Sequence, residues 1–76
     1  MTKAERIAKT LNADNTADFR QVAEAKAAEI GVGIYWAGTA APEPKNPSAE
    51  VWQTKNGEWI KRIGEVVRGQ DGVWRA

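Results

Sequence analysis

Two copies of one short turn pattern dominate the C-terminal third of this chain. The pattern is a glycine preceded by Asn or Asp and followed two residues later by Trp, in Asn56-Gly57-Glu58-Trp59 and in Asp71-Gly72-Val73-Trp74. Asn-Gly and Asp-Gly between strand-forming residues favour hairpins, because they accept the positive φ angles of tight turns. The pattern therefore predicts an antiparallel meander over 49–76. Its strands are expected near 49–54, 58–68 and 73–76.

Two helices are expected before the meander. Thr2 and Glu5 match a capping box, and apolar residues recur behind them at helical spacing, which predicts a first helix over about 2–11. The same spacing recurs further along and predicts a second helix over about 16–30. Gly31 follows it and suits the left-handed residue that often ends a helix.

A strand and a proline-rich connection are expected between the helices and the meander. Residues 32–37 alternate in the manner of a strand, whereas 38–48 holds all three prolines of the chain. Proline fixes φ and lacks the N–H that a sheet needs, so 38–48 is expected to be a semi-extended loop. The predicted fold class is α+β: a single domain over 1–76, with two N-terminal helices packed on an antiparallel sheet of three to four strands.

The register of the first predicted hairpin has two solutions. A two-residue loop at Asn56-Gly57 would pair Trp52 with Lys61. A three-residue loop, with its glycine in a bulge, would pair Trp52 with Ile60. We prefer the second because it brings opposite charges and like apolar side chains together. Gly64 interrupts the next strand and predicts a bulge or a sharp bend there.

The preferred register assigns the hairpin side chains to two faces. Trp59 is expected in the core with Val51 and Ile63, while Trp52 and Ile60 are expected on the opposite, outer face. The inverse assignment, with Trp52 in the core, stays open at this point. The distinction matters because tryptophan in a strand supplies either a large core contact or an exposed binding surface.

Composition argues against catalysis. The 76 residues include no histidine and no cysteine, so the commonest general base, the thiolate nucleophile and the main transition-metal ligands are all missing. No phosphate-loop motif occurs either. We therefore expect a protein that is not an enzyme and that uses no cofactor and no metal. The lack of cysteine, of a signal peptide and of a long apolar segment further predicts a cytoplasmic protein without a membrane partner.

Binding to another protein is the function that the sequence favours. Four tryptophans are many for the core of so small a chain, and an exposed tryptophan near arginine is typical of an interface hot spot. The net charge of +1 is too small for binding held by bulk charge alone. The predicted partner-binding residues are Trp52, Ile60, Arg62, Arg68, Lys55 and Arg75.

Two other functions remain open. Residues 51–76 carry five bases against three acids, so a basic sheet bearing tryptophans could bind nucleic acid directly. The second predicted helix has more acids than bases, which argues against its use as a recognition helix in DNA. The other alternative is a structural subunit of a larger assembly.

The two-helix start, the meander and the Asn56-Gly57-Glu58-Trp59 turn resemble, over 16–76, certain anti-CRISPR proteins that phages and mobile elements encode. The resemblance implies an inhibitor that occludes a surface of a nucleic-acid-handling complex in a bacterial host and has no chemistry of its own. Some such proteins mimic DNA through acidic charge. The net charge of +1 departs from that pattern and favours occlusion. The strand after the turn also resembles the middle strand of recombinase DNA-binding arms.

Overall fold

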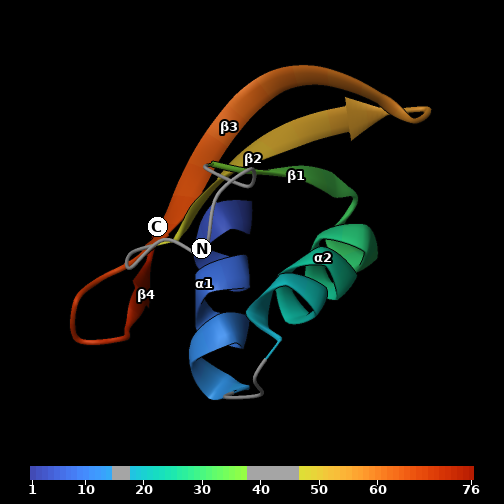
Figure 1. Cartoon of the computed structure of the whole chain (residues 1–76). Coiled ribbons are helices and arrows are strands. Elements are labelled where there is room, and N and C mark those ends of the chain that lie inside the picture. The colour runs from blue at the N-terminus through green and yellow to red at the C-terminus, as the bar shows by residue number, and fades with distance from the viewer. Residues whose placement is uncertain (15–17, 38–46) are drawn as a thin grey trace.

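The computed structural model describes residues 1–14, 18–37 and 47–76. Helices α1 (Lys3–Ala13) and α2 (Phe19–Ile30) precede an antiparallel sheet with the strand order β1-β2-β3-β4. The strands are β1 (Val32–Trp36), β2 (Ser48–Lys55), β3 (Glu58–Arg68) and β4 (Trp74–Arg75). Both helices pack on the same face of the sheet and leave its other face uncovered by helix (Figure 1). The predicted α+β class and the C-terminal meander are confirmed.

The helix ends follow the local chemistry of the sequence. The amide of Thr2 donates to Oε1 of Glu5 at 2.8 Å, and the amide of Glu5 donates to Oγ1 of Thr2 at 3.0 Å, which confirms the capping box. The hydrogen bond from the Thr2 backbone amide, and then that from the Thr2 side chain, lowers the pKa of the Glu5 carboxyl. Asp18 caps α2 by accepting from the amide of Gln21, and Gly31 ends it with φ at 76°. The first positions of the predicted second helix, 16 and 17, lie outside the described residues.

The proline-rich connection was predicted to extend to Ser48, but β2 already begins there. Pro47 is fully buried, and its carbonyl accepts a hydrogen bond of 3.0 Å from the amide of Arg68. A proline lacks the donor of a sheet ladder but keeps its acceptor, so it can lead directly into a strand. The rest of the predicted loop, 38–46, lies outside the described residues.

The core lies between the two helices and the sheet. Ile7 of α1, Val51 of β2 and Val66 of β3 are completely buried at its centre. At one end of the core Trp36, Trp74 and Phe19 form an aromatic cluster, in which the ring centroids lie 5.4 to 6.4 Å apart. Trp36 and Trp74 are both buried, so two of the four tryptophans serve the core.

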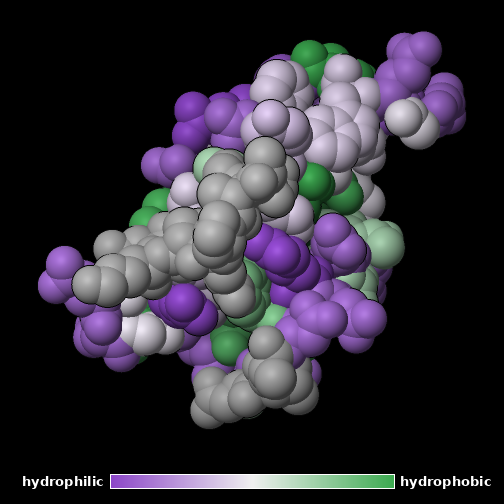
Figure 2. Space-filling model, viewed as in Figure 1, coloured by the Kyte–Doolittle hydropathy of each residue, from purple (hydrophilic) through white to green (hydrophobic). Residues whose placement is uncertain are grey.

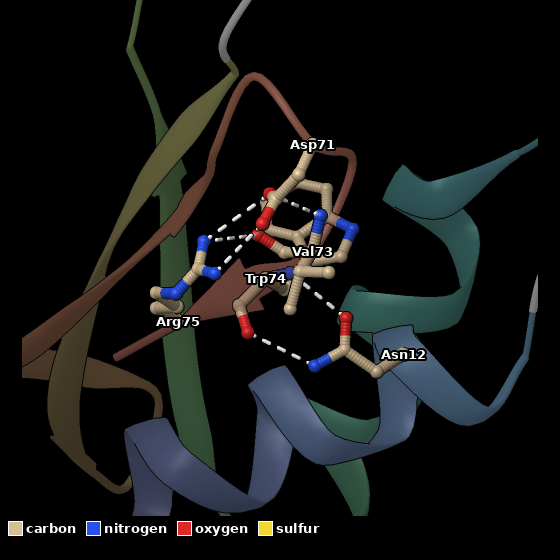
Figure 3. A network of polar contacts seen from close by, with 5 residues as sticks. All are labelled: Asn12, Asp71, Val73, Trp74 and Arg75. Carbon is tan, nitrogen blue, oxygen red and sulfur yellow. Dashed lines mark hydrogen bonds and ion pairs between the residues drawn. The ribbon is translucent and has the colours of Figure 1, made fainter.

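The second Gly-x-Trp turn folds as a hairpin that joins Arg68 to Trp74. Gly72 takes a φ of 81°, as the Asp-Gly pattern predicts. The carboxylate of Asp71 accepts from the amide of Val73 and from the guanidinium of Arg75, whose Nη2 lies 2.8 Å away. Figure 3 shows these contacts together with Asn12 of α1, which meets the backbone of Trp74. The short edge strand β4 is therefore held by contacts within its own turn and by Asn12 of α1.

The first hairpin does not have the predicted loop. Asn56 and Gly57 have φ angles of 53° and 82°, and Lys55 pairs with Glu58 across them. Two successive positive φ angles define a two-residue primed turn, whose twist matches that of the flanking strands. The preferred register, with Trp52 opposite Ile60, is wrong, because Trp52 pairs with Arg62.

Two register shifts interrupt the pairing of β2 with β3, and the first of them moves the partner of Trp52 from Lys61, as a two-residue loop alone would give, to Arg62. They fall opposite the steps from Thr54 to Gln53 and from Trp52 to Val51, where Ile60 and Ile63 have no partner in β2. The second shift lies directly before Gly64, so the predicted irregularity at this glycine is confirmed. A Cβ on Gly64 would lie 3.0 Å from Cβ of Ala4, and the missing side chain therefore lets α1 approach the strand. Figure 1 shows how strongly β3 curves over the helices.

The two-residue turn and the shifts together change which side chains face the core. Trp59, expected inside, pairs with Thr54 and is 47% exposed, and Ile63 is exposed as well. Each extra residue reverses the alternation of side chains beyond it, so an alternation read directly from the sequence fails across a bulge. Val51 is buried, as predicted, and Trp52 lies on the opposite face, as predicted, but is half-buried there.

Candidate functional site

The face of the sheet opposite the helices carries the other two tryptophans. Paired residues of antiparallel strands point to the same side, so the pairing places two rows of side chains there. One row runs Gly33, Trp52, Arg62, and the next runs Tyr35, Glu50, Glu65. Trp59 joins them from the start of β3. We call Tyr35, Trp52 and Trp59 the aromatic face.

The indole of Trp59 lies directly on the backbone of β1. A Cβ added to Gly33 would stand 2.5 Å from Cε2 of Trp59, closer than any real contact. Glycine is therefore the residue that lets this ring approach the backbone of β1 so closely. The ring of Trp52 lies beside it, with 6.0 Å between the ring centroids and 35° between the planes. The two indoles fix each other on a rigid strand surface while keeping part of their area exposed.

Tyr35, Glu50, Trp52 and Trp59 line a shallow hollow of about 200 Å³. The indole N–H of Trp52 donates to Oε1 of Glu50 at 3.0 Å, which holds this carboxylate at the rim. Tyr35 is 59% exposed and remains accessible beside it. In Figure 2 pale and green side chains gather over the strands at the top of the view, while purple, hydrophilic ones lie at the hairpin tip and around the helices.

Among the described residues, acidic charge predominates around the aromatic face. Nη2 of Arg62 lies 3.1 Å from Oε2 of Glu65, and its Nε lies 4.0 Å from Oε2 of Glu50. One positive charge therefore stands between two negative ones, which leaves a net charge of −1. Exposed pairs of this kind stabilise a fold very little. Their effect here is to orient Arg62 toward carboxylates of its own sheet.

The structure brings together only some of the predicted binding residues. Trp52 and Arg62 belong to the aromatic face and its charged border. Ile60 is 52% exposed in the neighbouring bulge, and Lys55 stands at the hairpin tip. Arg68 and Arg75 lie apart from them.

Arg68 and Arg75 lie at the other end of the sheet, beside the second hairpin. The guanidinium of Arg68 lies over the rings of Phe19 and Trp74, at 5.4 and 5.9 Å from their centroids. The guanidinium of Arg75 is bound to Asp71. These two bases therefore contact the core and the second turn, and they do not extend the aromatic face.

Sequence reasoning missed Tyr35 and Trp59 as surface residues. The signal for Tyr35 was present, because it alternates with Ile34 and Trp36 in a strand whose other face is apolar. The side of Trp59 follows from the two-residue Asn56-Gly57 turn, which pairs it with Thr54 on the face of Trp52, and the predicted three-residue loop concealed this.

Other kinds of site find little support. Within 1–14, 18–37 and 47–76, no three Asp, Glu, His or Cys side chains are grouped so that they could hold a metal ion. Neither α1 nor α2 has the length and apolar character needed to cross a membrane. Comparisons of the chain with protein-family models, with curated proteins and with solved structures give no match. The function must therefore be argued from the geometry of the aromatic face.

Proposed function

We propose that this chain is a protein-binding module and that the aromatic face is its contact surface. The observation that carries the proposal is the seating of Trp59 on Gly33, on the side of the sheet that the helices leave uncovered. The core already has Trp36 and Trp74, so the outer indoles are not needed to fill it. Exposed tryptophan and tyrosine on a rigid scaffold are typical of interface hot spots, because they offer large areas at small entropic cost.

The charges support a protein partner over a nucleic acid. A sheet that stacks bases also needs cations beside its aromatic residues to contact phosphates. Around the aromatic face Arg62 is matched by Glu50 and Glu65, while Arg68 and Arg75 lie at the far end of β3. Phosphates would therefore meet carboxylates at the position where stacking would place them.

A narrower form of the proposal makes the chain a phage-encoded inhibitor in the bacterial cytoplasm. It would occlude a surface of a host nucleic-acid-handling complex of the CRISPR type. This form rests on the resemblance in size and turn pattern, and the aromatic face supplies the surface that occlusion requires. A purified complex of that type is accordingly the first partner to test.

The test compares capture by the chain and by matched surface variants. The immobilised wild type, Trp59→Ala and Val73→Ala are exposed to a nuclease-treated bacterial lysate and to a purified CRISPR-type complex. Val73 is an exposed apolar residue away from the aromatic face and serves as the control. We expect one protein partner to be retained by the wild type and by Val73→Ala and to be lost with Trp59→Ala.

Two results would contradict the proposal. Equal capture by Trp59→Ala would exclude the aromatic face as the contact surface. Capture that disappears with nuclease and falls steeply with salt would favour direct nucleic-acid binding. Light scattering of the free protein tests the structural-subunit alternative, which requires stable self-association.

A further inference from the structure

The hollow on the aromatic face combines three aromatic rings with one carboxylate. Tyr35, Trp52 and Trp59 surround Glu50, and each is contributed by strand rather than by loop. The face of an aromatic ring attracts a cation through its quadrupole, and tryptophan does so most strongly. A purely apolar ligand would gain nothing from the carboxylate and would bury it at a cost.

Local charge also favours a positively charged ligand. The indole of Trp52 fixes one oxygen of Glu50 at 3.0 Å, while Arg62 reaches the other only at 4.0 Å and lies closer to Glu65. Among the residues that the structure describes, the negative charge of Glu50 is therefore only weakly matched. A cation in the hollow would lie over the rings and beside this carboxylate at the same time.

The hollow is held in shape by contacts that do not involve a ligand. The missing side chain at Gly33 seats Trp59, and the β1–β2 pairing holds Tyr35 beside Glu50. Such preorganisation lowers the entropic cost of binding. At about 200 Å³ the space is smaller than the pockets that hold drug-sized molecules, and it matches the end of one side chain.

We propose that this hollow receives one cationic side chain, an arginine, a lysine or a methylated lysine, from the protein partner. This inference rests on the proposed function and adds the chemistry that the contact surface recognises. A choline lipid carries a similar cation but fits less well. The phosphate next to its ammonium group would stand against Glu50 and Glu65, which repel it.

The test uses the full chain and two small probes of nearly equal shape, choline and its neutral analogue 3,3-dimethylbutan-1-ol. Binding is followed by NMR through the indole N–H signals. Trp52 and Trp59 report the hollow, and Trp36 and Trp74, both buried in the core, act as internal controls. We expect choline to shift only the first two signals and to bind on the order of fivefold more tightly than the alcohol.

Two variants of glutamate residues distinguish the contribution of the Glu50 charge to choline affinity from the contribution of the shape of the hollow. Glu50→Gln keeps an oxygen that accepts from Trp52 but removes the charge, so it should lower choline affinity several-fold and bring it close to that of the alcohol. Glu58→Gln makes the same change at an exposed position outside the hollow and should leave both affinities unchanged. Acetylated amides of lysine, trimethyl-lysine and arginine then identify which cation binds best.

Three results would overturn the inference. They are equal affinity for choline and the alcohol, the absence of any choline-dependent shift of Trp52 and Trp59, and cosedimentation of the chain with phosphatidylcholine vesicles. The first two leave the proposed function intact if Trp59→Ala still loses the protein partner. If Trp59→Ala captures as much partner as the wild type, the proposed function fails whatever the probes show.

Discussion

The carboxamide of Asn12 meets both backbone polar groups of Trp74. Its Nδ2 donates to the Trp74 carbonyl at 2.9 Å, and its Oδ1 accepts from the Trp74 amide at 2.8 Å (Figure 3). The two residues are 62 positions apart in the sequence. Asn12 thus offers the edge of β4 the donor and the acceptor that a further strand would supply, and it ties α1 to the C-terminal hairpin.

Replacing Asn12 by Ala should destabilise the fold by about 1–3 kcal/mol, because the substitution leaves the part-buried backbone groups of Trp74 without partners. Urea unfolding measures the loss, and hydrogen exchange of the Trp74 amide should accelerate. Lys9→Ala, at an exposed position of the same helix, is the control and should change stability little. Equal stability of the two variants would show that the pairing contributes nothing.

Trp74 and Trp59 should respond differently to truncation. Trp74→Ala removes a buried ring from the cluster with Phe19 and Trp36. The loss of folding free energy should be about 3–5 kcal/mol, which would leave most molecules of so small a protein unfolded. Trp59→Ala removes a half-exposed ring and should cost only about 1 kcal/mol. Thermal melts of the two variants provide the measurement. The opposite order would mean that the two faces of the sheet are assigned the wrong way round.

Gly33→Ala should displace the indole of Trp59 without unfolding the chain. The backbone of Gly33 is not in the positive-φ region, so alanine is acceptable there apart from the collision with the ring. We expect a changed near-ultraviolet circular dichroism spectrum, a shifted Trp59 indole signal and loss of partner binding. In the Trp59→Ala background, Gly33→Ala should leave the stability of the fold nearly unchanged. This double-mutant cycle isolates the contact between Gly33 and Trp59. An unchanged Trp59 signal in the single variant would contradict the close approach.

The ion pair between Asp71 and Arg75 should make stability depend on acid pH. Hydrogen bonds from the Arg75 guanidinium, and then from the Val73 amide, lower the pKa of the Asp71 carboxyl from 3.8 to about 2. Because the folded pKa lies below the unfolded one, the stabilisation is complete above about pH 4 and disappears as pH falls toward about 2. The pair is exposed, so the effect is small.

An NMR titration of the Asp71 side chain should therefore show a midpoint near pH 2. Arg75→Gln should move that midpoint back toward 3.8, and Asp71→Asn should remove this contribution to acid unfolding. A midpoint that stays near 2 in Arg75→Gln would show that the arginine is not the cause.

Local sequence determined most of the elements of this protein. The Thr2–Glu5 capping box, Gly31 and the Asn56-Gly57 turn each act over a few residues, so their chemistry could be recognised without the rest of the chain. The same holds for Gly64, whose missing side chain marks the bend of β3. The α+β class and the C-terminal meander followed from these signals.

The tertiary structure decided which tryptophans serve the core and which form the aromatic face. All four have the same intrinsic preference for burial, and their fates differ because α1 and α2 cover only one side of the sheet. The two-residue turn then pairs Trp59 with Thr54 and so places it on the side of Trp52, while the unpaired residues Ile60 and Ile63 shift the pairing further along β3. Bulges depend on strand curvature around the packed helices, which is a property of the assembled fold and not of any short segment.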